Sequence, residues 1–214
     1  MNITIIGAGN VGGALASSMT RAGHTVVIAS SGSESALKVA LATGARAAAT
    51  NIEAVAGAEV VILAVGFPVV QTLATELGSA LDGKVLIDAT NAMKPDYSGP
   101  LFDTGSAGEA VQALFPRARV VKAFNTAFAS RQASPVIDGI ASDGFVAGDD
   151  AAAKATVEAL LTSIGFRPVD VGPLSFSRYL EALAYLNIAI NMKGGAWQTT
   201  FKLVGPAPVS AVAA

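Results

Sequence analysis

The chain has 214 residues, of which 52% are hydrophobic and 14% charged, and its formal net charge is −2. This length allows one large domain, or one domain with a small appendage. Because there is no basic run and no excess of cations, the composition argues against a nucleic-acid partner bound through its phosphates. The absence of Cys excludes disulfides and thiolate nucleophiles, and with a single His we expect no metal site.

The apolar composition fits either a membrane protein or a parallel sheet that is buried on both faces. A spanning helix needs about 20 predominantly apolar residues. The two most apolar stretches are both interrupted, because residues 54–70 contain Glu59 and residues 179–192 contain Glu181. Residues 3–6 are too short for the apolar core of a signal peptide. We therefore expect a buried sheet, no membrane partner and a cytoplasmic location.

Strand and helix patterns alternate along the chain. We expect strands at 2–6, 25–29, 58–65, 85–89, 119–123, 144–147 and 166–171. Helices are expected at 10–21, 33–43, 68–81 and 173–193, and from Asp149 or Asp150 to 163. Capping boxes at 50–53 and 106–109 open a short helix and a helix that ends at 116, residues 91–103 form a loop, and residues 205–214 form a frayed tail.

This alternation predicts an α/β fold with a Rossmann-type, doubly wound, mostly parallel sheet and a small C-terminal α/β-helical part. We expect residues 1–140 to form the dinucleotide-binding domain. Residues 141–214 are expected to form a smaller part that completes the active-site cleft and carries a dimer interface.

The most specific motif is the run from Gly7 to Gly12, which has the pattern G-x-G-x-x-G and follows the first apolar strand. Gly7 permits a tight turn, Gly9 lets a pyrophosphate approach the backbone, and Gly12 lets the helix lie close to the strand. Free N–H groups at the helix start favour a phosphate. We therefore predict a dinucleotide site that includes Asn10 and Val11. The alternative is a tight turn that binds nothing.

The end of the second strand predicts which dinucleotide is bound. An NAD site usually carries a carboxylate there, whereas this chain has Ser30 and Ser31. Two hydroxyls can donate to a 2′-phosphate, so NADP is favoured over NAD, with a lower KM for NADPH than for NADH. Lys38 is the nearest cation. The alternative is that the two serines only cap the following helix.

In open parallel sheets, ligands lie beyond the carboxyl ends of the strands. We therefore expect Ala64 and Val65, Asn91, and Ala123 and Asn125 to lie near the nicotinamide. Asn91 and Asn125 are the candidate catalytic residues, because their amides suit hydrogen bonds to a carboxamide or a substrate. Their alternative role is to shape loops. Thr126 could bind in the same way, and Asp88 could fix a loop.

No residue of this chain stands out as a proton donor. His24 lies in a turn at the other end of the sheet, where we expect a structural role. Lys122, Tyr97, Tyr179 and Tyr185 are candidate general acids. The simpler hypothesis is a hydride transfer between two stacked rings, because a flavin or deazaflavin acceptor is its own electron sink.

Several motifs resemble the coenzyme F420-dependent NADP oxidoreductase family over nearly the whole chain. The most specific is Gly-Pro-Leu-Ser-x-Ser-Arg-x-x-Glu-x-Leu from Gly172 to Leu183, and the glycine turn, residues 120–126 and residues 148–150 are also similar. The resemblance implies hydride transfer between NADP(H) and the deazaflavin F420, in a cleft between the Rossmann part and the C-terminal part. Family members bind the 2′-phosphate with Ser or Thr and a following Arg, but here Gly32 stands where that Arg is expected.

The helix at 173–193 is apolar nearly all round and must be buried, which predicts a homodimer through this helix. Asn187 and Asn191 share one face, where they could reach a ligand or bridge the dimer. Arg178 and Glu181 are three residues apart and are expected to pair locally.

We therefore predict an NADP-dependent oxidoreductase that transfers a hydride to F420 or a flavin-like acceptor. One alternative is an NADP(H)-binding sensor or regulatory module without turnover. The other is a small-molecule carbonyl or imine reductase, but that class carries a longer helical C-terminal domain than the residues after Val171 allow.

Overall fold

The centre of the molecule is an eight-stranded sheet with the strand order β10-β9-β6-β5-β4-β1-β2-β3. The computed structural model describes residues 1–94, 96 and 98–205, so the predicted tail beyond Gly205 lies outside the described residues. All described pairs of this sheet are parallel except β6 with β9. Its strands are β1 (Asn2–Ile6), β2 (Thr25–Ala29), β3 (Arg46–Ala47), β4 (Val60–Leu63), β5 (Val85–Asp88), β6 (Arg119–Lys122), β9 (Asp143–Gly148) and β10 (Arg167–Gly172).

The register of the sheet brings the ends of its central strands into one row. Ile6 lies opposite Leu63, Leu63 opposite Asp88, and Asp88 opposite Lys122. The strands are runs of Val, Ile and Leu, and β4 and β5 are buried throughout, as expected for a sheet covered on both faces. The residues that follow these strands therefore share one edge of the sheet, where ligands of such folds bind.

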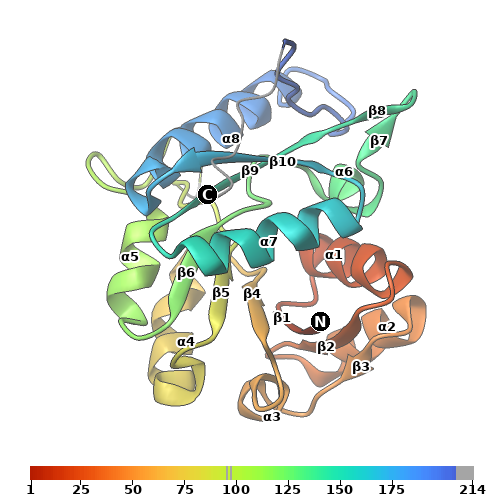
Figure 1. Ribbon diagram of the computed structural model, residues 1–214, viewed down its shortest axis with the longest axis vertical. Coiled ribbons are helices and arrows are strands. Elements are labelled where there is room, and N and C mark those ends of the chain that lie inside the picture. Colours follow the sequence, from red (N-terminus) through yellow and green to blue (C-terminus); the bar gives the residue numbers. More distant parts are fainter. Residues whose placement is uncertain (95, 97, 206–214) are drawn as a thin grey trace.

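Helices cover both faces of this sheet (Figure 1). On one face, α1 (Asn10–Arg21), α2 (Ser33–Thr43) and α7 (Ala151–Ser163) pack into one core cluster. On the other face, α3 (Asn51–Val55), α4 (Val70–Leu77) and α5 (Ala107–Leu114) form a second cluster. The long helix α8 (Ser177–Asn191) packs through Leu180 on β9 and β10 and lies beside α5.

Three capping residues act as the sequence predicts. Thr50 and Ser106 accept hydrogen bonds from the backbone N–H of Glu53 and Glu109, at 3.1 and 3.2 Å. Asp150, not Asp149, caps α7 by accepting from Ala153 N–H at 2.7 Å. Local hydrogen bonding thus sets these helix starts.

The predicted α/β fold with a mostly parallel sheet is confirmed, but several element bounds were wrong. The single helix expected at 68–81 is divided into a 3-10 turn at Phe67–Val69, α4, and a second 3-10 turn at Gly78–Leu81, because Pro68 stands at its start and Gly78 has a φ of +45°. The helix expected from 173 begins as a 3-10 turn at Leu174–Phe176, and α8 ends at Asn191.

The strand expected at 58–65 is only Val60–Leu63. Four short elements were not predicted: β3, α6 (Ala129–Ala133), β7 (Val136–Ile137) and β8 (Ile140–Ala141). The boundary at residue 140 stays a prediction, and β9 and β10, which follow it, continue the same sheet.

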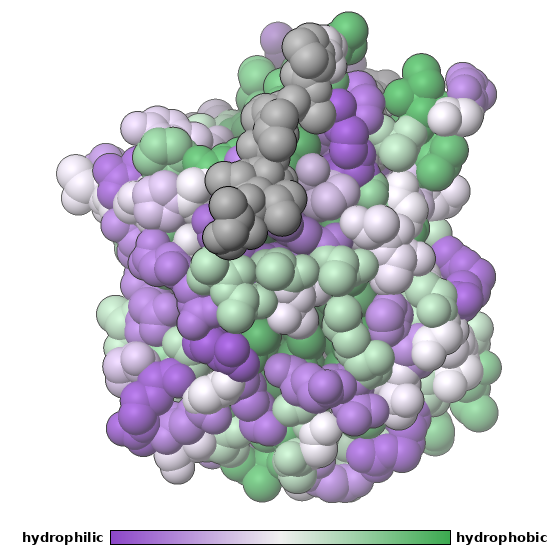
Figure 2. All heavy atoms as spheres, in the orientation of Figure 1, coloured by the Kyte–Doolittle hydropathy of each residue, from purple (hydrophilic) through white to green (hydrophobic). Residues whose placement is uncertain are grey.

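The surface over α7 mixes hydrophilic and hydrophobic residues, with strongly hydrophobic atoms near the β7–β8 hairpin (Figure 2), where Val136 and Ile140 are exposed. Within the ranges that the structure describes, no helix is long and apolar enough to span a bilayer.

Candidate functional site

The turn from β1 to α1 has the geometry that its three glycines predict. Gly7 has a φ of +116°, and its N–H donates to the carbonyl of Ala29 at 2.8 Å. A Cβ atom on Gly7 would collide with the carbonyl oxygen of Ala64, and one on Gly12 with that of Gly7. These two glycines therefore serve the close packing of the turn.

Gly9 differs from its neighbours because it faces open space. Apart from Gly9 itself and its chain neighbours, no heavy atom lies within 4 Å of the position that a Cβ atom on Gly9 would occupy. Gly9 is also the N-cap of α1, where no side chain caps the helix and no acidic residue lies in the first turn. Uncapped N–H groups and the positive end of the helix dipole thus face this space, which suits the pyrophosphate of a dinucleotide.

A cavity of about 500 Å³ extends from the glycine turn to the end of β2. Ser30, Ser31 and Ser35 line it, and Ser30 Oγ donates to the carbonyl of Gly32 at 2.6 Å. The N-cap of α2 is Gly32, and no side chain caps this helix. The alternative that Ser30 and Ser31 cap α2 is therefore wrong. Ser31 instead lines the cavity.

Lys38 lies beside this region. Together with Gly9, Asn10 and Ser35 it lines an adjoining cavity of about 410 Å³. Lys38 is therefore a cationic residue close to the predicted phosphate positions.

Asn51 and Glu76 also line the 500 Å³ cavity, and the sequence did not indicate them. Asn51 Nδ2 donates to Glu76 Oε2 at 2.9 Å, and Asn51 Oδ1 is buried without a hydrogen-bond partner among the described residues. A buried carbonyl oxygen of this kind needs a donor, which an amino group of a bound nucleotide would provide. The capping box at 50–53 marks this helix start, but no local pattern reveals that α3 lies beside α4.

Asn91 and Asn125 are joined to each other at the ends of β5 and β6. Asn125 Nδ2 donates to Asn91 Oδ1, and Asn91 Nδ2 donates to the carbonyl of Asn125, both at 3.0 Å. This pairing is the loop-shaping role that the sequence offers as their alternative. However, Asn125 Oδ1 is buried without a partner among the described residues. The pair therefore keeps one acceptor free for an N–H donor such as a carboxamide.

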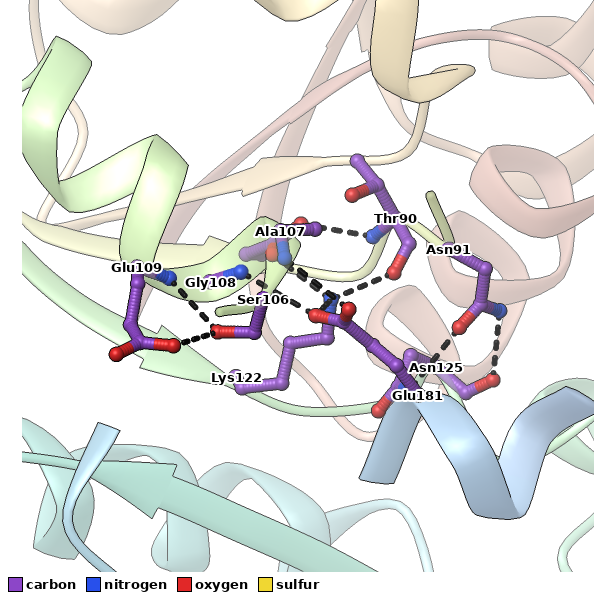
Figure 3. A network of polar contacts seen from close by, with 10 residues as sticks. Thr90, Asn91, Ser106, Ala107, Gly108, Glu109, Lys122, Asn125 and Glu181 are labelled. Atoms are coloured by element: carbon purple, nitrogen blue, oxygen red, sulfur yellow. Dashed lines mark hydrogen bonds and ion pairs between the residues drawn. The ribbon is translucent and has the colours of Figure 1, made fainter. Parts of the chain in front are cut away.

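Behind these amides lies a buried network centred on Lys122, whose side chain and that of Asp88 are 0% exposed. Lys122 Nζ lies 2.8 Å from Asp88 Oδ2, 2.7 Å from the carbonyl of Thr90 and 3.0 Å from Glu181 Oε1 (Figure 3). Its three N–H groups thus have three acceptors. Asp88 Oδ1 also accepts from Thr90 N–H at 2.9 Å, so Asp88 does fix the loop that follows β5.

Glu181 joins α8 to this network. It accepts hydrogen bonds from the N–H groups of Ala107 and Gly108, at 3.0 and 3.3 Å, at the start of α5. The predicted local pair of Arg178 with Glu181 is wrong, because the buried ammonium and two free helix N–H groups attract the carboxylate inward. Arg178 pairs instead with Glu109 at 3.2 Å.

A larger cavity, of about 880 Å³, borders the end of the glycine turn at Asn10 and Val11. Its walls come from the start of α1, the start of α6, the end of α8 and the segment after α8. The lining residues are Asn10, Val11, Phe128, Ala129, Ser130, Ile188, Met192, Ala196, Trp197 and Gln198. None of these ten residues carries a side chain that titrates near neutral pH.

The candidate general acids lie elsewhere. Lys122 is committed to its buried network, Tyr185 Oη donates to the carbonyl of Ser98 at 3.1 Å, and Tyr179 is an exposed residue of α8. Tyr97 lies outside the described residues. The structure places none of the three described candidates among the residues that line these cavities.

His24 and Asp143 have shifted pKa values, and neither residue lines the cavities described above. Partial burial and the nearby N-terminal amine lower the pKa of His24, which lies at the amino end of β2 and contacts Ser163 Oγ at 2.8 Å. Burial alone would raise the pKa of Asp143, but hydrogen bonds from Arg167, Leu203 N–H and Lys202 outweigh it and lower that pKa. The ionised Asp143 therefore stabilises the fold at neutral pH, and this contribution is lost as the pH falls through the lowered pKa.

Within the described part of the chain, no cluster of three or more His, Asp or Glu residues is arranged to hold a metal ion.

The chain is similar to known proteins over most of its length. The profile of the family described as "NADP oxidoreductase coenzyme F420-dependent" matches residues 2–92. The F420-dependent NADP reductase of Methanothermobacter marburgensis is 34% identical over 213 residues, covering 90% of this chain and 93% of the relative. The metalloreductase STEAP3 of Rattus norvegicus is 33% identical over 187 residues and 85% of this chain, but this chain spans only 36% of that protein.

A solved structure covers nearly the whole chain. A candidate F420-dependent NADP reductase of Arthrobacter sp. FB24 is 30% identical with a TM-score of 0.82, over 96% of this chain and all of that one. The similarity thus extends beyond the glycine turn to the C-terminal helix, and the prediction of an NADP-dependent oxidoreductase is confirmed. The chain belongs to the coenzyme F420-dependent NADP oxidoreductase family.

Proposed function

We propose that this chain transfers a hydride between NADP(H) and F420 or a flavin-like acceptor. The observation that carries the proposal is that consecutive residues of one turn border two cavities. Gly9 lines the cavity that suits a dinucleotide, and Asn10 and Val11 line the large, uncharged one. A single turn can therefore hold the nicotinamide ring so that the ring of the acceptor meets it from the adjacent cavity.

The residues of this chain fit NADP(H) along the first cavity. The open space at Gly9 and the uncapped start of α1 would take the pyrophosphate, and Ser31 and Lys38 would take the 2′-phosphate. Ala64, Val65, Asn91, Ala123 and Asn125 would surround the nicotinamide, with Asn125 Oδ1 accepting from its carboxamide. When bound, NADPH supplies the hydride.

The larger cavity favours a ring acceptor over a carbonyl or imine. Reduction of a carbonyl needs a proton donor at the forming hydroxyl, and the lining of this cavity provides only Asn, Gln and Ser as polar side chains. These amides and this hydroxyl can orient a substrate, but they are not acids that give up a proton near neutral pH. A deazaflavin or flavin carries its own electron sink and needs only to be held in register.

Stopped-flow oxidation of NADPH against F420, FMN and FAD in parallel tests the proposal, with a carbonyl and imine panel as comparison. We expect turnover with F420 or a flavin and none with the panel. Binding of NADPH without oxidation by any acceptor would favour the sensor, and turnover with the panel alone would favour the reductase.

The preference for NADP gives a second test. Replacing Ser31 by Asp places a carboxylate beside the expected 2′-phosphate, so the KM for NADPH should rise by about tenfold, equal to about 1.4 kcal/mol of binding free energy. The KM for NADH should change by less than about twofold. Steady-state kinetics with both nucleotides measures this difference, and Ser31→Ala is the matched control that removes the hydroxyl without adding charge. Equal effects of Ser31→Asp on both nucleotides would contradict the assignment.

We also propose a homodimer through α8, as the sequence predicts. Leu186 and Ile190 of this helix are 50% and 53% exposed in the single chain, an apolar surface that a second copy would cover. Light scattering of the parent should give a dimer and Leu186→Glu a monomer. Leu41→Glu on α2, where Leu41 is 81% exposed, is the matched control and should remain dimeric. A monomeric parent would refute the dimer.

The cytoplasmic location stays a prediction.

A further inference from the structure

The segment from Ala196 to Leu203, which we call the strap, closes one side of the larger cavity. It carries Trp197, the only Trp of the chain. Trp197 is 45% exposed, lines the cavity, and has a φ of +56°. A bulky residue in this left-handed region is strained, and such strain persists only where the surrounding contacts impose it.

A clasp of three polar side chains imposes that conformation. Thr199 Oγ1 donates to Asn187 Oδ1 and accepts from Asn191 Nδ2, both at 2.6 Å, and Asn191 Oδ1 accepts from Trp197 N–H at 2.9 Å. Asn187 and Asn191 are buried. Their shared face on α8, from which we expected a ligand contact or a dimer bridge, therefore binds the strap.

Further contacts fix the indole and the far end of the strap. Ser130 Oγ donates to the carbonyl of Trp197 at 2.7 Å, and the Phe128 ring meets the indole edge-to-face with centroids 5.3 Å apart. At the other end, the buried Asp143 accepts from Leu203 N–H at 2.6 Å and from Lys202 Nζ at 3.0 Å. The strap is thus held at both ends, and Trp197, at the end held by the clasp, lies on the cavity wall.

We propose that Trp197 is a binding residue for the second substrate, whose planar ring packs against the indole, and that Asn187, Asn191 and Thr199 are positioning residues that hold this wall in place. This inference rests on the proposed function. The cavity fits a planar multi-ring acceptor because its volume is about 880 Å³, its lining is uncharged, and two of its residues are aromatic. Heteroaromatic rings stack favourably on aromatic side chains of this kind.

Steady-state kinetics of three variants tests the inference with F420 and FMN as acceptors. Trp197→Ala should raise the acceptor KM by about tenfold and leave the KM for NADPH within about twofold, while Trp197→Phe should restore most of the affinity. Thr199→Val, which does not alter the lining, should raise the acceptor KM in the same direction. Val204→Ala, at a residue 96% exposed next to the strap, is the control and should match the parent.

Fluorescence provides a readout that does not depend on turnover. Because Trp197 is the only Trp, its emission reports on the strap alone, and Thr199→Val should shift it to the red and increase its quenching by acrylamide. Unchanged emission in Thr199→Val would overturn the positioning role of the clasp.

Equilibrium dialysis of FMN and F420 against the protein saturated with NADP⁺ separates the two proposals. If the parent binds an acceptor but does not reduce it, the proposed function fails, and weaker binding by Trp197→Ala still supports the inference. If the parent turns over and Trp197→Ala has the parental KM for the acceptor, the inference is overturned while the proposed function stands. If the parent neither binds nor reduces either acceptor, both are overturned.

Discussion

Replacing Gly9 by Ala is expected to weaken the binding of NADPH strongly while leaving the fold intact. The new methyl group would enter the open space in front of α1, where no heavy atom lies within 4 Å apart from those of Gly9 and its chain neighbours. In the proposed binding mode it would meet the pyrophosphate. We expect affinity for NADPH to fall by at least about 30-fold, which is about 2 kcal/mol. The free energy of unfolding should change by less than about 0.5 kcal/mol, as for surface substitutions.

Calorimetric titration with NADPH and urea unfolding measure these two quantities, and Gly12→Ala is the matched control. A Cβ atom on Gly12 would collide with the carbonyl oxygen of Gly7, so this variant should lose stability before it reports on binding. Overpacking of this kind costs typically about 1–3 kcal/mol or more. Normal NADPH affinity in Gly9→Ala would show that the dinucleotide lies elsewhere.

The parts of this site that sequence reasoning predicted are those that one short segment determines. The glycine turn, its strand and its helix have their expected bounds, because the pattern specifies a backbone conformation within a dozen residues. The capping residues Thr50 and Ser106 are similarly local. In these places the geometry is encoded between neighbours, although the division of the helix expected at 68–81 shows that local signals can also be missed.

The parts that could not be predicted depend on which distant segments meet. The rule for neighbours on a helix pairs Arg178 with Glu181, but that rule ignores a buried ammonium supplied by β6. The spacing of Asn187 and Asn191 correctly indicates one shared face, yet only the fold shows that Thr199 returns to it. Asn51 and Glu76 meet for the same reason, since α3 and α4 become neighbours only once the sheet is assembled.

The buried network behind the amide pair leads to the second large effect, a loss of stability in Lys122→Met. The substitution conserves the apolar stem of the side chain but leaves Asp88 and Glu181 facing each other without the ammonium that lies 2.8 and 3.0 Å from them. Removing one partner of a buried pair costs about 3–5 kcal/mol. For a chain of this size that lowers the Tm by roughly 6–20 °C, at about 2–4 °C per kcal/mol.

Thermal and urea unfolding of Lys122→Met and Arg117→Met compare the stability lost when a buried ion pair is broken with that lost when an exposed one is broken. Arg117 pairs with Asp82 at 2.6 Å, but the two side chains are 67% and 38% exposed, so Arg117→Met should cost less than about 1 kcal/mol. Adding Asp88→Asn and Glu181→Gln to Lys122→Met should recover more than half of the loss, because the buried carboxylates are then neutral amides. If Lys122→Met cost no more than Arg117→Met, the network would not be what joins α8 and α5 to the sheet, and the walls of the larger cavity would depend on the apolar contacts of Leu180 instead.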